Sequence, residues 1–482
     1  MVNLALRDIS HAVHLTPYES NWPLLSYSVG YAAVLFVAGA LIDKTGLRFT
    51  FLLGIAILVG ANALCAWAPN KDALIVGRAI AGLGGGINTV CLIPLITSSL
   101  PDAKDRNRGL TLLFVSGPLG MVCGIIIGAL VTESSVGWRG IFWITMILCA
   151  VLFVLAVLLV PSRAQEPVKE CRESVEEAGE ARSQCQQSQN PPFDYIGVIL
   201  ACVGIPCLIY GLNDGPNRGW TDPAVLSTLV IGGVCILALP VYDGWFCLTA
   251  DPFIPREMLH SVNMILMTFN FLFNGGGITA WWYLVTQTLL NGLQYSPIRS
   301  ALYLLPAAFA CLASAPVAGF LASKLSERTQ ITGAWVWMAA FLIPWALIPE
   351  HVSPAWPIVF AMCYIVANVP GIVRAQAAVL STIPQSQHAR IGSLLAIVFQ
   401  VGGSTLIALM NVLVAATSSN DSPASVLHGY HNAAWLLCGV MAASAVLFVL
   451  LYRKPRDTDV LAGSEAERNE GEKVEELGEV EE

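Results

Sequence analysis

The sequence contains few charged residues. Aspartate, glutamate, lysine and arginine make up 12% of the 482-residue chain, whereas they make up about 25% of an average soluble protein. Hydrophobic residues account for 55% of the chain, and the mean hydropathy is +0.66. Because so little charge cannot give a chain of this length a polar surface, the composition excludes an ordinary soluble globular protein.

Motifs for catalysis and metal binding are also missing. The 13 cysteines form no Cys-x-x-Cys pair and no cluster with histidine at metal-ligand spacing. Most of them stand singly in apolar segments, where cysteine behaves as a small hydrophobic residue. The chain has no Gly-x-x-x-x-Gly-Lys-Ser/Thr loop to hold nucleotide phosphates. We therefore expect no enzyme activity, no metal, no cofactor and no direct use of ATP.

Acidic residues are absent from the middle of the apolar segments and collect in two polar stretches. The formal net charge of −8 comes from residues 161–193 and from the tail 453–482, while the rest of the chain is close to neutral. Glu-rich polar stretches are typical of solvated, disordered segments. Neither stretch is basic, so no nucleic-acid partner is expected.

Long apolar segments fill the chain from Trp22 to Tyr452. Each has about the 20 residues that a helix needs to cross the hydrocarbon core of a bilayer. Only helices and closed barrels satisfy their backbone hydrogen bonds in lipid, and these segments lack the two-residue alternation of strands. The sequence therefore predicts an all-α, polytopic membrane protein. The thirteen predicted spans are residues 22–42, 49–68, 73–99, 109–132, 138–160, 194–213, 224–246, 262–290, 297–322, 331–348, 355–381, 390–416 and 432–452.

Basic residues divide the loops between these spans into two alternating sets. Lysine and arginine are concentrated in one set, which marks the cytoplasmic side. Residues 39–48 and 319–328 each place a glycine turn and a basic loop between two spans, and such internal repeats are typical of transporters that bind substrate between two halves. The sequon at Asn420 falls in an outer loop and is a candidate glycosylation site. The expected units are a first bundle (1–160), a cytosolic linker (161–193), an inserted helix pair (194–248), a second bundle (249–452) and an acidic cytosolic tail (453–482).

Residues 39–48 are a candidate gating latch. Two glycines allow helix ends to approach closely, and the Asp43 carboxylate can accept hydrogen bonds from a helix N-terminus or an arginine. A plain basic turn is the alternative. In the second bundle Ser323 and Ser326 replace the aspartate and the second glycine, so we expect a weaker latch there. The predicted latch residues are Gly39, Asp43, Lys44, Gly46 and Arg48.

Arg78 and a glycine series are the next candidates. An arginine inside a span costs about 2.5–3.5 kcal/mol unless it is paired or hydrated, so Arg78 is either functional or held by backbone carbonyls for structure. Pro118 can bend the span 109–132, and glycines four residues apart make a smooth face for close helix packing. The residues of this glycine series are Gly117, Pro118, Gly120, Gly124 and Gly128.

Polar and aromatic residues inside the spans are candidates for a substrate cavity. Asn270 and Asn274 share a helix face because they are four residues apart, although amides also bond across helices in membranes. Many aromatic side chains with little fixed charge favour an uncharged or amphiphilic organic substrate. The candidates are Tyr27, Tyr31, Asn88, Asn270, Asn274, Trp281, Trp282, Gln287, Tyr303, Gln400 and Asn411.

Several of these segments resemble the major facilitator superfamily. Residues 39–48 are similar to its loop motif Gly-x-Leu-Ala-Asp-Arg-x-Gly-Arg-Lys, and the segment around Arg78 is similar to its fourth-helix motif. Gly117-Pro118 resembles part of its antiporter signature, without the usual Gly-Gly that follows. Further landmarks at 138–142, 194–197, 251–255 and 295–306 resemble later helix boundaries. Together these segments look like the fourteen-span drug:proton antiporters, particularly fungal aminotriazole-resistance-type efflux proteins.

This resemblance implies a two-bundle fold with an inserted helix pair and a role for Arg78 in proton movement. It implies a monomeric secondary transporter of the plasma membrane, more than of the vacuolar membrane, that exports drugs, toxins or secondary metabolites in exchange for protons by alternating access. It also implies that residues 1–9 are the second half of a first span that is truncated here. The alternatives are a transporter of an inorganic solute or nutrient, and a degenerate membrane protein that transports nothing.

Overall fold

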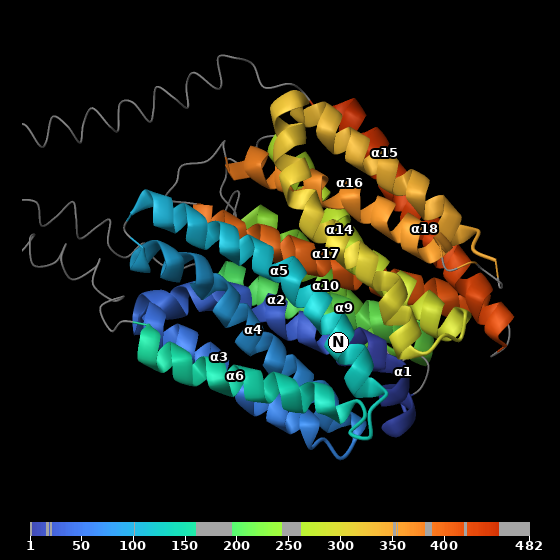
Figure 1. The fold of residues 1–482 in the computed structure, drawn as a ribbon, viewed down its shortest axis with the longest axis horizontal. Helices are drawn as coiled ribbons and strands as arrows, with labels where there is room; N and C mark the ends of the chain where they lie inside the picture. The colour runs from blue at the N-terminus through green and yellow to red at the C-terminus, as the bar shows by residue number, and fades with distance from the viewer. Residues whose placement is uncertain are drawn as a thin grey trace, which may run out of the picture.

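The computed structural model is a set of long helices that lie side by side (Figure 1). It describes residues 2–15, 19, 22–100, 102–160, 195–242, 262–349, 353, 355–380, 388–418 and 422–452. The linker 161–193, the tail 453–482 and the sequon at Asn420 lie outside the described residues. The helices are α1 (Val2–Ala12), α2 (Trp22–Thr45), α3 (Leu47–Ala66), α4 (Lys71–Ser99), α5 (Ala103–Thr132), α6 (Arg139–Leu159), α9 (Tyr195–Arg218), α10 (Pro223–Val241), α12 (Val262–Asn270), α13 (Gly276–Gln287), α14 (Pro297–Lys324), α15 (Glu327–Ala346), α16 (Ala355–Leu380), α17 (His388–Thr417) and α18 (Pro423–Leu451), with π-helical turns η3 (Phe271–Gly275) and η4 (Thr288–Gly292) on either side of α13.

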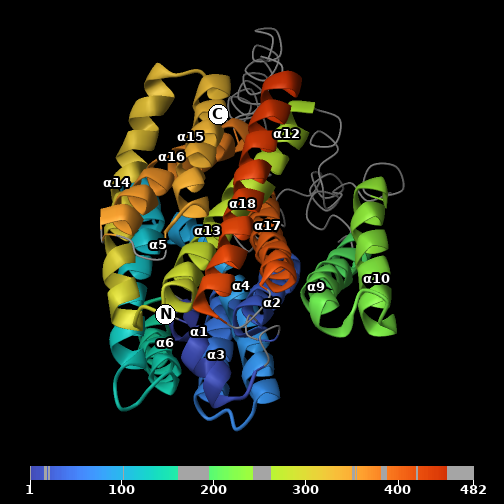
Figure 2. The same cartoon turned by 90° about the vertical axis from the view of Figure 1, so that its right-hand side faces the viewer.

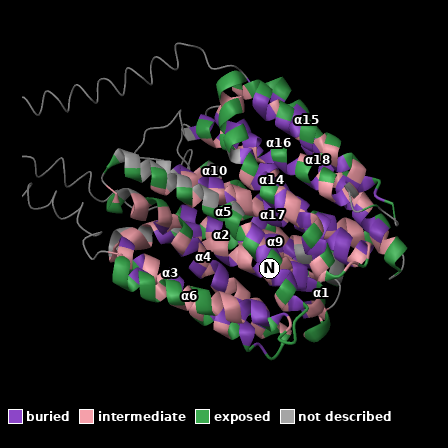
Figure 3. Cartoon of the chain, viewed as in Figure 1, coloured by how far each residue is buried: buried purple, intermediate pink, exposed green. Residues whose placement is uncertain are grey.

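The predicted all-α membrane fold is confirmed. Each of the thirteen predicted spans corresponds to a helix, with α12, η3, α13 and η4 forming one continuous span. Within the described residues, seven helices are long and apolar enough to cross a membrane by length and hydropathy, and shorter apolar helices lie at Leu119–Thr132, Ile196–Leu212 and Pro223–Leu239. Large apolar side chains such as Leu158 (74% exposed) and Leu237 (72% exposed) lie at the surface, as expected for a protein that faces lipid. Figure 3 shows exposed residues along the helices at the surface of the molecule.

The first bundle is built around α4. This helix packs on α2 and α3, and α3 packs on α6. Glycines of α4 bring the backbones close, since a methyl group on Gly86 would lie 2.8 Å from the carbonyl oxygen of Tyr31 in α2. The short helix α1 packs mainly on α5, with Leu4 and Ile9 buried.

The second bundle repeats this arrangement. Helix α16 packs on α14 and α15, and α15 packs on α18, as α4, α2, α3 and α6 do in the first bundle. Its first span differs from an ordinary helix because η3 and η4 interrupt it. Such π-helical turns are rare and frequently mark functional sites. The second bundle also holds the three largest fully buried side chains of the described residues, Trp281, Trp335 and Trp345.

The two bundles meet where α5 packs on α14 and where α2 packs on α17. The pair α9 and α10 lies to one side of them, as Figure 2 shows. Helix α9 contacts both α2 and α17 and therefore covers one seam between the bundles, whereas α10 packs on α9. This position outside the two bundles fits an insertion between them.

Candidate functional site

Arg78 lies in the part of α4 near Lys71, and its side chain reaches α2. The terms outer and inner are used here for the helix ends that the loop charges predict to face the outside and the cytoplasm. Its Nε donates a hydrogen bond to the carbonyl oxygen of Pro23 (2.8 Å), and its guanidinium lies 4.6 Å from the ring centre of Tyr27. Tyr27 in turn stacks on Tyr31. No carboxylate among the described residues forms an ion pair with Arg78, so its charge is balanced by a carbonyl and an aromatic face.

The predicted latch joins α2 to α3. Gly46 has a φ of +87°, a left-handed conformation that favours glycine, and it lies directly before the first residue of α3. Arg48, the second residue of α3, donates a hydrogen bond to the carbonyl oxygen of Val157 near the end of α6 (2.9 Å). A methyl group on Gly39 would meet nothing within 4 Å. The side chains of Asp43 and Lys44 lie outside the described residues.

The corresponding turn of the second bundle has a different chemistry. Ser326 takes the place of Gly46, with an ordinary φ of −67°, and its hydroxyl accepts the N–H of Thr329 at the start of α15. Arg328 donates to the carbonyl oxygen of Val449 near the end of α18 (2.8 Å). The Arg48 bond joins α3 to α6, and the Arg328 bond joins the equivalent helices α15 and α18 at equivalent positions.

Glu327 gives the second bundle a charge cluster that sequence reasoning missed. Its carboxylate lies 3.6 Å from Arg374 of α16 and accepts a hydrogen bond from the hydroxyl of Tyr452 at the end of α18 (2.9 Å). The inner ends of α15, α16 and α18 are therefore tied together by side chains.

The glycine series of α5 is divided in two. Gly117 and Gly120 are exposed, and a methyl group on either would meet nothing within 4 Å, whereas Gly124 and Gly128 are buried. Among the described residues, nothing packs closely on Gly120, and its role in helix packing stays a prediction. The side chain of Pro118 lies outside the described residues.

The two asparagines of the 262–290 span lie inside the second bundle. Asn274, in η3, is 0% exposed, and its side-chain oxygen accepts a hydrogen bond from Asn368 of α16 (2.8 Å). Asn270 is also buried, and neither atom of its amide has a hydrogen-bond partner in the part of the chain that the structure describes. These surroundings indicate that Asn274 forms a bond between helices and does not line an open cavity. The partner, Asn368, was missed because a single asparagine in an apolar span gives no signal of what it faces.

Aromatic side chains gather on α13. Trp281 is fully buried and stacks on Tyr364 of α16, with ring centres 4.7 Å apart, and Trp282 meets Trp281 edge to face. Trp282 is only partly buried. The pair therefore continues from the interior of the second bundle toward its surface.

The remaining candidates fall in separate places. Asn88 bonds α4 to α3 when its amide is oriented to satisfy both atoms, donating to Phe51 (2.9 Å). Tyr303 accepts from Arg299 at the outer end of α14 (3.0 Å). Asn411 of α17 accepts from Tyr283 (2.9 Å), and Gln400, also in α17, is partly buried.

Gln287 takes part in contacts between the bundles. Its Nε2 donates to the side-chain oxygen of Asn3 in α1 (3.1 Å), and Asn3 donates to the carbonyl oxygen of Trp282 (3.4 Å). Arg7 of α1 donates to the carbonyl oxygen of Leu290 in η4 (3.4 Å). Helix α1 thus joins the outer ends of the two bundles.

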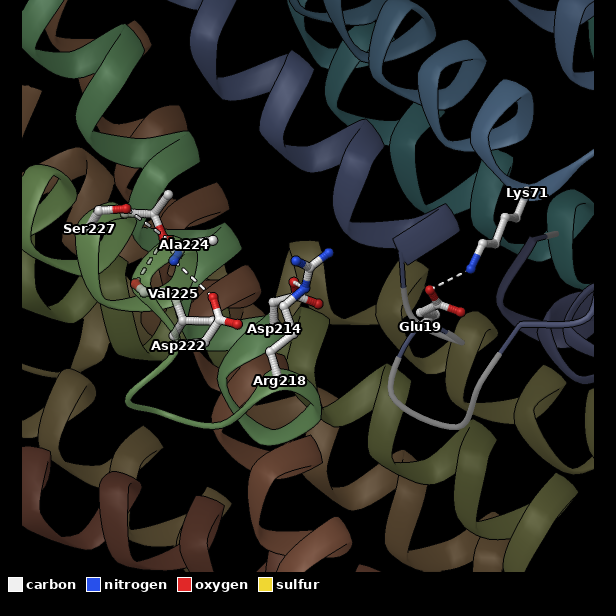
Figure 4. Close-up of polar contacts among 9 residues, drawn as sticks. Glu19, Lys71, Asp214, Arg218, Asp222, Ala224, Val225 and Ser227 are labelled. Atoms are coloured by element: carbon white, nitrogen blue, oxygen red, sulfur yellow. Dashed lines mark hydrogen bonds and ion pairs between the residues drawn. The ribbon is translucent and has the colours of Figure 1, made fainter.

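Two ion pairs at the outer side lie within the first bundle and within the inserted pair. Lys71, at the start of α4, pairs with Glu19 (2.6 Å), and Arg218 pairs with Asp214 at the end of α9 (2.8 Å) (Figure 4). Asp222 caps the N-terminus of α10 through the N–H of Ala224 (2.8 Å). Among the described residues, no group of three His, Cys, Asp or Glu side chains could hold a metal ion.

Comparison with known proteins identifies the family that has this architecture. A sequence profile of the Major Facilitator Superfamily matches residues 1–407. The chain belongs to the major facilitator superfamily. The Major facilitator superfamily multidrug transporter mfsC of Aspergillus fumigatus is 31% identical to it over 461 residues, which cover 95% of this chain and 84% of that relative. The Tetracenomycin C resistance and export protein of Streptomyces glaucescens is 26% identical, and the match covers 88% and 74% of the two chains.

Solved structures show the same fold. One, described as structural insights into substrate recognition in proton dependent oligopeptide transporters, aligns with a TM-score of 0.63, 13% identity and coverage of 97% of this chain and 95% of that chain. At this identity the likeness shows the major facilitator fold alone. Members of this superfamily are secondary transporters and not enzymes, so the predicted absence of catalysis agrees with the family.

Proposed function

We propose that this secondary transporter exports small organic compounds, namely drugs, toxins or secondary metabolites, in exchange for protons. The observation that carries the proposal is the 31% identity with a fungal multidrug transporter over 95% of the chain. The aromatic residues Tyr27, Tyr31 and Trp282 supply apolar surface with polar tips, which suits amphiphilic organic molecules. Transport follows from alternating access, in which two packed bundles rock about a site between them.

Arg78 is the proposed centre of proton coupling. Its neighbours Pro23 and Tyr27 are neutral. The charge of Arg78 therefore interacts with a proton or a charged substrate that arrives nearby, without a fixed carboxylate that neutralises it.

We further propose that the chain is a monomer of the plasma membrane, that it belongs to the fourteen-span drug:proton antiporter group, and that residues 39–48 form its cytoplasmic latch.

Dye accumulation in cells tests this proposal. Cells that lack their own exporters and express the chain are expected to retain less of a hydrophobic fluorescent dye than cells that express Arg78→Ala at equal membrane levels. Several unlabelled amphiphilic drugs should compete with the dye. Competition by an inorganic ion or a nutrient instead of by drugs would assign the chain to nutrient transport. Dye retention equal to that of cells without the chain would indicate a protein that transports nothing.

A further inference from the structure

Asn3 and Gln287 form a hydrogen-bonded pair of amides between the two bundles. The Nε2 of Gln287, the last residue of α13, donates to the side-chain oxygen of Asn3 in α1 (3.1 Å). The Nδ2 of Asn3 in turn donates to the carbonyl oxygen of Trp282, also in α13 (3.4 Å). Asn3 is therefore both an acceptor and a donor toward the second bundle, and both bonds would be lost if the outer ends of the bundles separated.

Other residues of the second bundle orient Gln287. Its side-chain oxygen accepts a hydrogen bond from the Nδ2 of Asn291 in η4 (2.8 Å), and the same Nδ2 lies 3.5 Å from the hydroxyl oxygen of Tyr430 in α18. Gln287 is 2% exposed and Tyr430 is 8% exposed. Because its oxygen is bound by Asn291, the amide of Gln287 is held with its nitrogen facing Asn3. A row of hydrogen-bonding side chains thus runs from α1 across α13 and η4 to α18.

Helix α1 contacts both bundles. It packs on α5 and α2 of the first bundle and on α13, η4 and α14 of the second. Leu4 belongs to the large apolar core that includes Leu284 of α13, whereas Ile9 belongs to a smaller apolar core with Leu74 in the first bundle. The guanidinium of Arg7 donates to the carbonyl oxygen in η4 that belongs to Leu290 (3.4 Å), where the last carbonyl groups of a helix lack partners within it. Apolar burial and three polar bonds therefore connect α1 to the second bundle.

The chemistry of the amide pair suits a contact that opens and closes repeatedly. Neither Asn3 nor Gln287 carries a charge, and a hydrogen bond between neutral groups contributes little net free energy because water can replace the partner. A buried donor that has no partner at all costs the full free energy of its desolvation. The nearly fully buried amide of Gln287 can therefore leave Asn3 only when water enters between the outer ends. The contact is stable while the site is dry and weak once water reaches it.

We propose that Asn3 and Gln287 form an outer gate of this transporter, which holds the outer ends of the bundles together and opens as water enters. The inference rests on the alternating access of the proposed exporter and names a contact that must break when its outer side opens. It assigns Gln287, a candidate for the substrate cavity, to the gate instead. Both residues are positioning residues, because they set the ratio of two conformations. A change that weakens one conformation shifts the population toward the other.

Distances between the outer ends test the gate without any transport. Spin labels on unnatural amino acids at Ser135, between α5 and α6, and at Ala424, near the start of α18, avoid the natural cysteines, and both positions are exposed. The full chain is reconstituted in nanodiscs, and distance distributions are recorded at one neutral pH. Asn3→Leu removes two bonds between the bundles. It should raise the ratio of open to closed outer ends about tenfold, since each neutral hydrogen bond contributes roughly a threefold factor.

Further variants separate the gate from a general loss of packing. Gln287→Met keeps the length of the side chain and removes its amide, so it should also raise the open-to-closed ratio. In the double variant the ratio should rise by less than the product of the two single factors, because Asn3 and Gln287 share one bond. Asn62→Leu is the matched control, since the amide of Asn62 donates to the carbonyl oxygen of Leu58 within α3 (2.8 Å). This control should keep the wild-type distances.

Three results would overturn the proposal. They are wild-type distances in both Asn3→Leu and Gln287→Met, single effects that multiply in the double variant, and an equal shift in Asn62→Leu. Thermal unfolding shows whether each variant is folded, and Gln287→Met carries the test by itself if Asn3→Leu does not fold. A larger open population in a chain that fails to export dye would refute the exporter and leave the gate standing. Dye export with unchanged distances in the gate variants would refute the gate and leave the exporter standing.

Discussion

The two bundles repeat one helix arrangement but close their inner ends differently. In both, an arginine at the second position of a helix, Arg48 or Arg328, donates to the carbonyl oxygen two residues before the end of the last helix of the same bundle. This bond satisfies a carbonyl that has no partner within its own helix and interacts favourably with the helix dipole. Backbone capping is therefore the part of the inner end that the two bundles share.

The residue before each arginine makes the difference. The first bundle has Leu47, which is buried, and the second has Glu327, which binds Arg374 and Tyr452. The first bundle relies on close backbone contacts between α4 and α2, while the second adds charges and amides between its helices. The comparison shows that one fold can be stabilised by small residues in one half and by polar side chains in the other.

The largest expected effect concerns the two arginines inside the equivalent helices α4 and α16. Arg78→Ala should abolish export while membrane insertion stays normal, because no other described cation lies beside Tyr27 and Pro23. Arg374→Ala should lower export only in part, since Arg374 pairs with Glu327 at the inner end. Dye export at matched expression measures both. Full export by Arg78→Ala would remove Arg78 from the mechanism.

Glycine substitutions compare close packing in the two bundles. Gly86→Ala in α4 and Gly402→Ala in α17 would each place a methyl group against a backbone carbonyl, of Tyr31 and Leu272 respectively. We expect each to lower the free energy of unfolding by about 1–3 kcal/mol, the usual cost of overpacking. Gly120→Ala is the matched control, because its methyl group would meet nothing within 4 Å. Thermal unfolding in detergent measures the three, and equal melting temperatures would contradict the packing described.

Substitutions at Leu47 and Glu327, which occupy equivalent positions in the two bundles, test the charge cluster. Glu327→Gln should reduce the free energy of unfolding by about 1 kcal/mol, because the ion pair is partly exposed and such pairs contribute about 0–1 kcal/mol, with a further loss from the bond to Tyr452. Leu47→Gln should cost a comparable amount for another reason, since it places an amide in an apolar site. Adding Arg374→Ala to each variant should change the cost only for Glu327→Gln. Additive effects at both sites would argue against the pairing.

The smallest effect is expected for the shared caps. Arg48→Ala and Arg328→Ala should each lower the free energy of unfolding by about 0.3–1 kcal/mol, the usual range for a cation at a helix C-terminus. The two values should agree, because the two bonds are equivalent and of similar length (2.9 and 2.8 Å). A marked difference in melting temperature between these variants would show that the bundles do not share this contact.

Much of the fold could be predicted from the sequence. The length of each apolar segment predicts a span, because lipid leaves few ways to satisfy a backbone, and all thirteen predicted spans have a helix. The turn at Gly46 and its replacement by Ser326 were visible as motif positions. Both residues lie at the turns where they were predicted, and the two turns use different backbone conformations.

Partners across the bundle could not be predicted. Glu327 and Arg374 are separated by a whole helix in the sequence, and their pairing depends on how α15 packs on α16. The same holds for Asn274 with Asn368 and for Gln287 with Asn3. Period and spacing describe one helix at a time, so they predict the face on which a residue lies but not the side chain it meets. The expected functions of Asp43, Arg78 and the α5 glycines remain predictions.

Transport by the purified full-length protein in liposomes tests the central claim most directly. With a fluorescent amphiphilic dye on one side and a pH gradient imposed across the membrane, the account predicts dye movement toward the more acidic side. This movement should stop when the gradient is dissipated and should be absent for Arg78→Ala. Dye movement that does not depend on the gradient, or none at all from a correctly inserted protein, would contradict proton-coupled export.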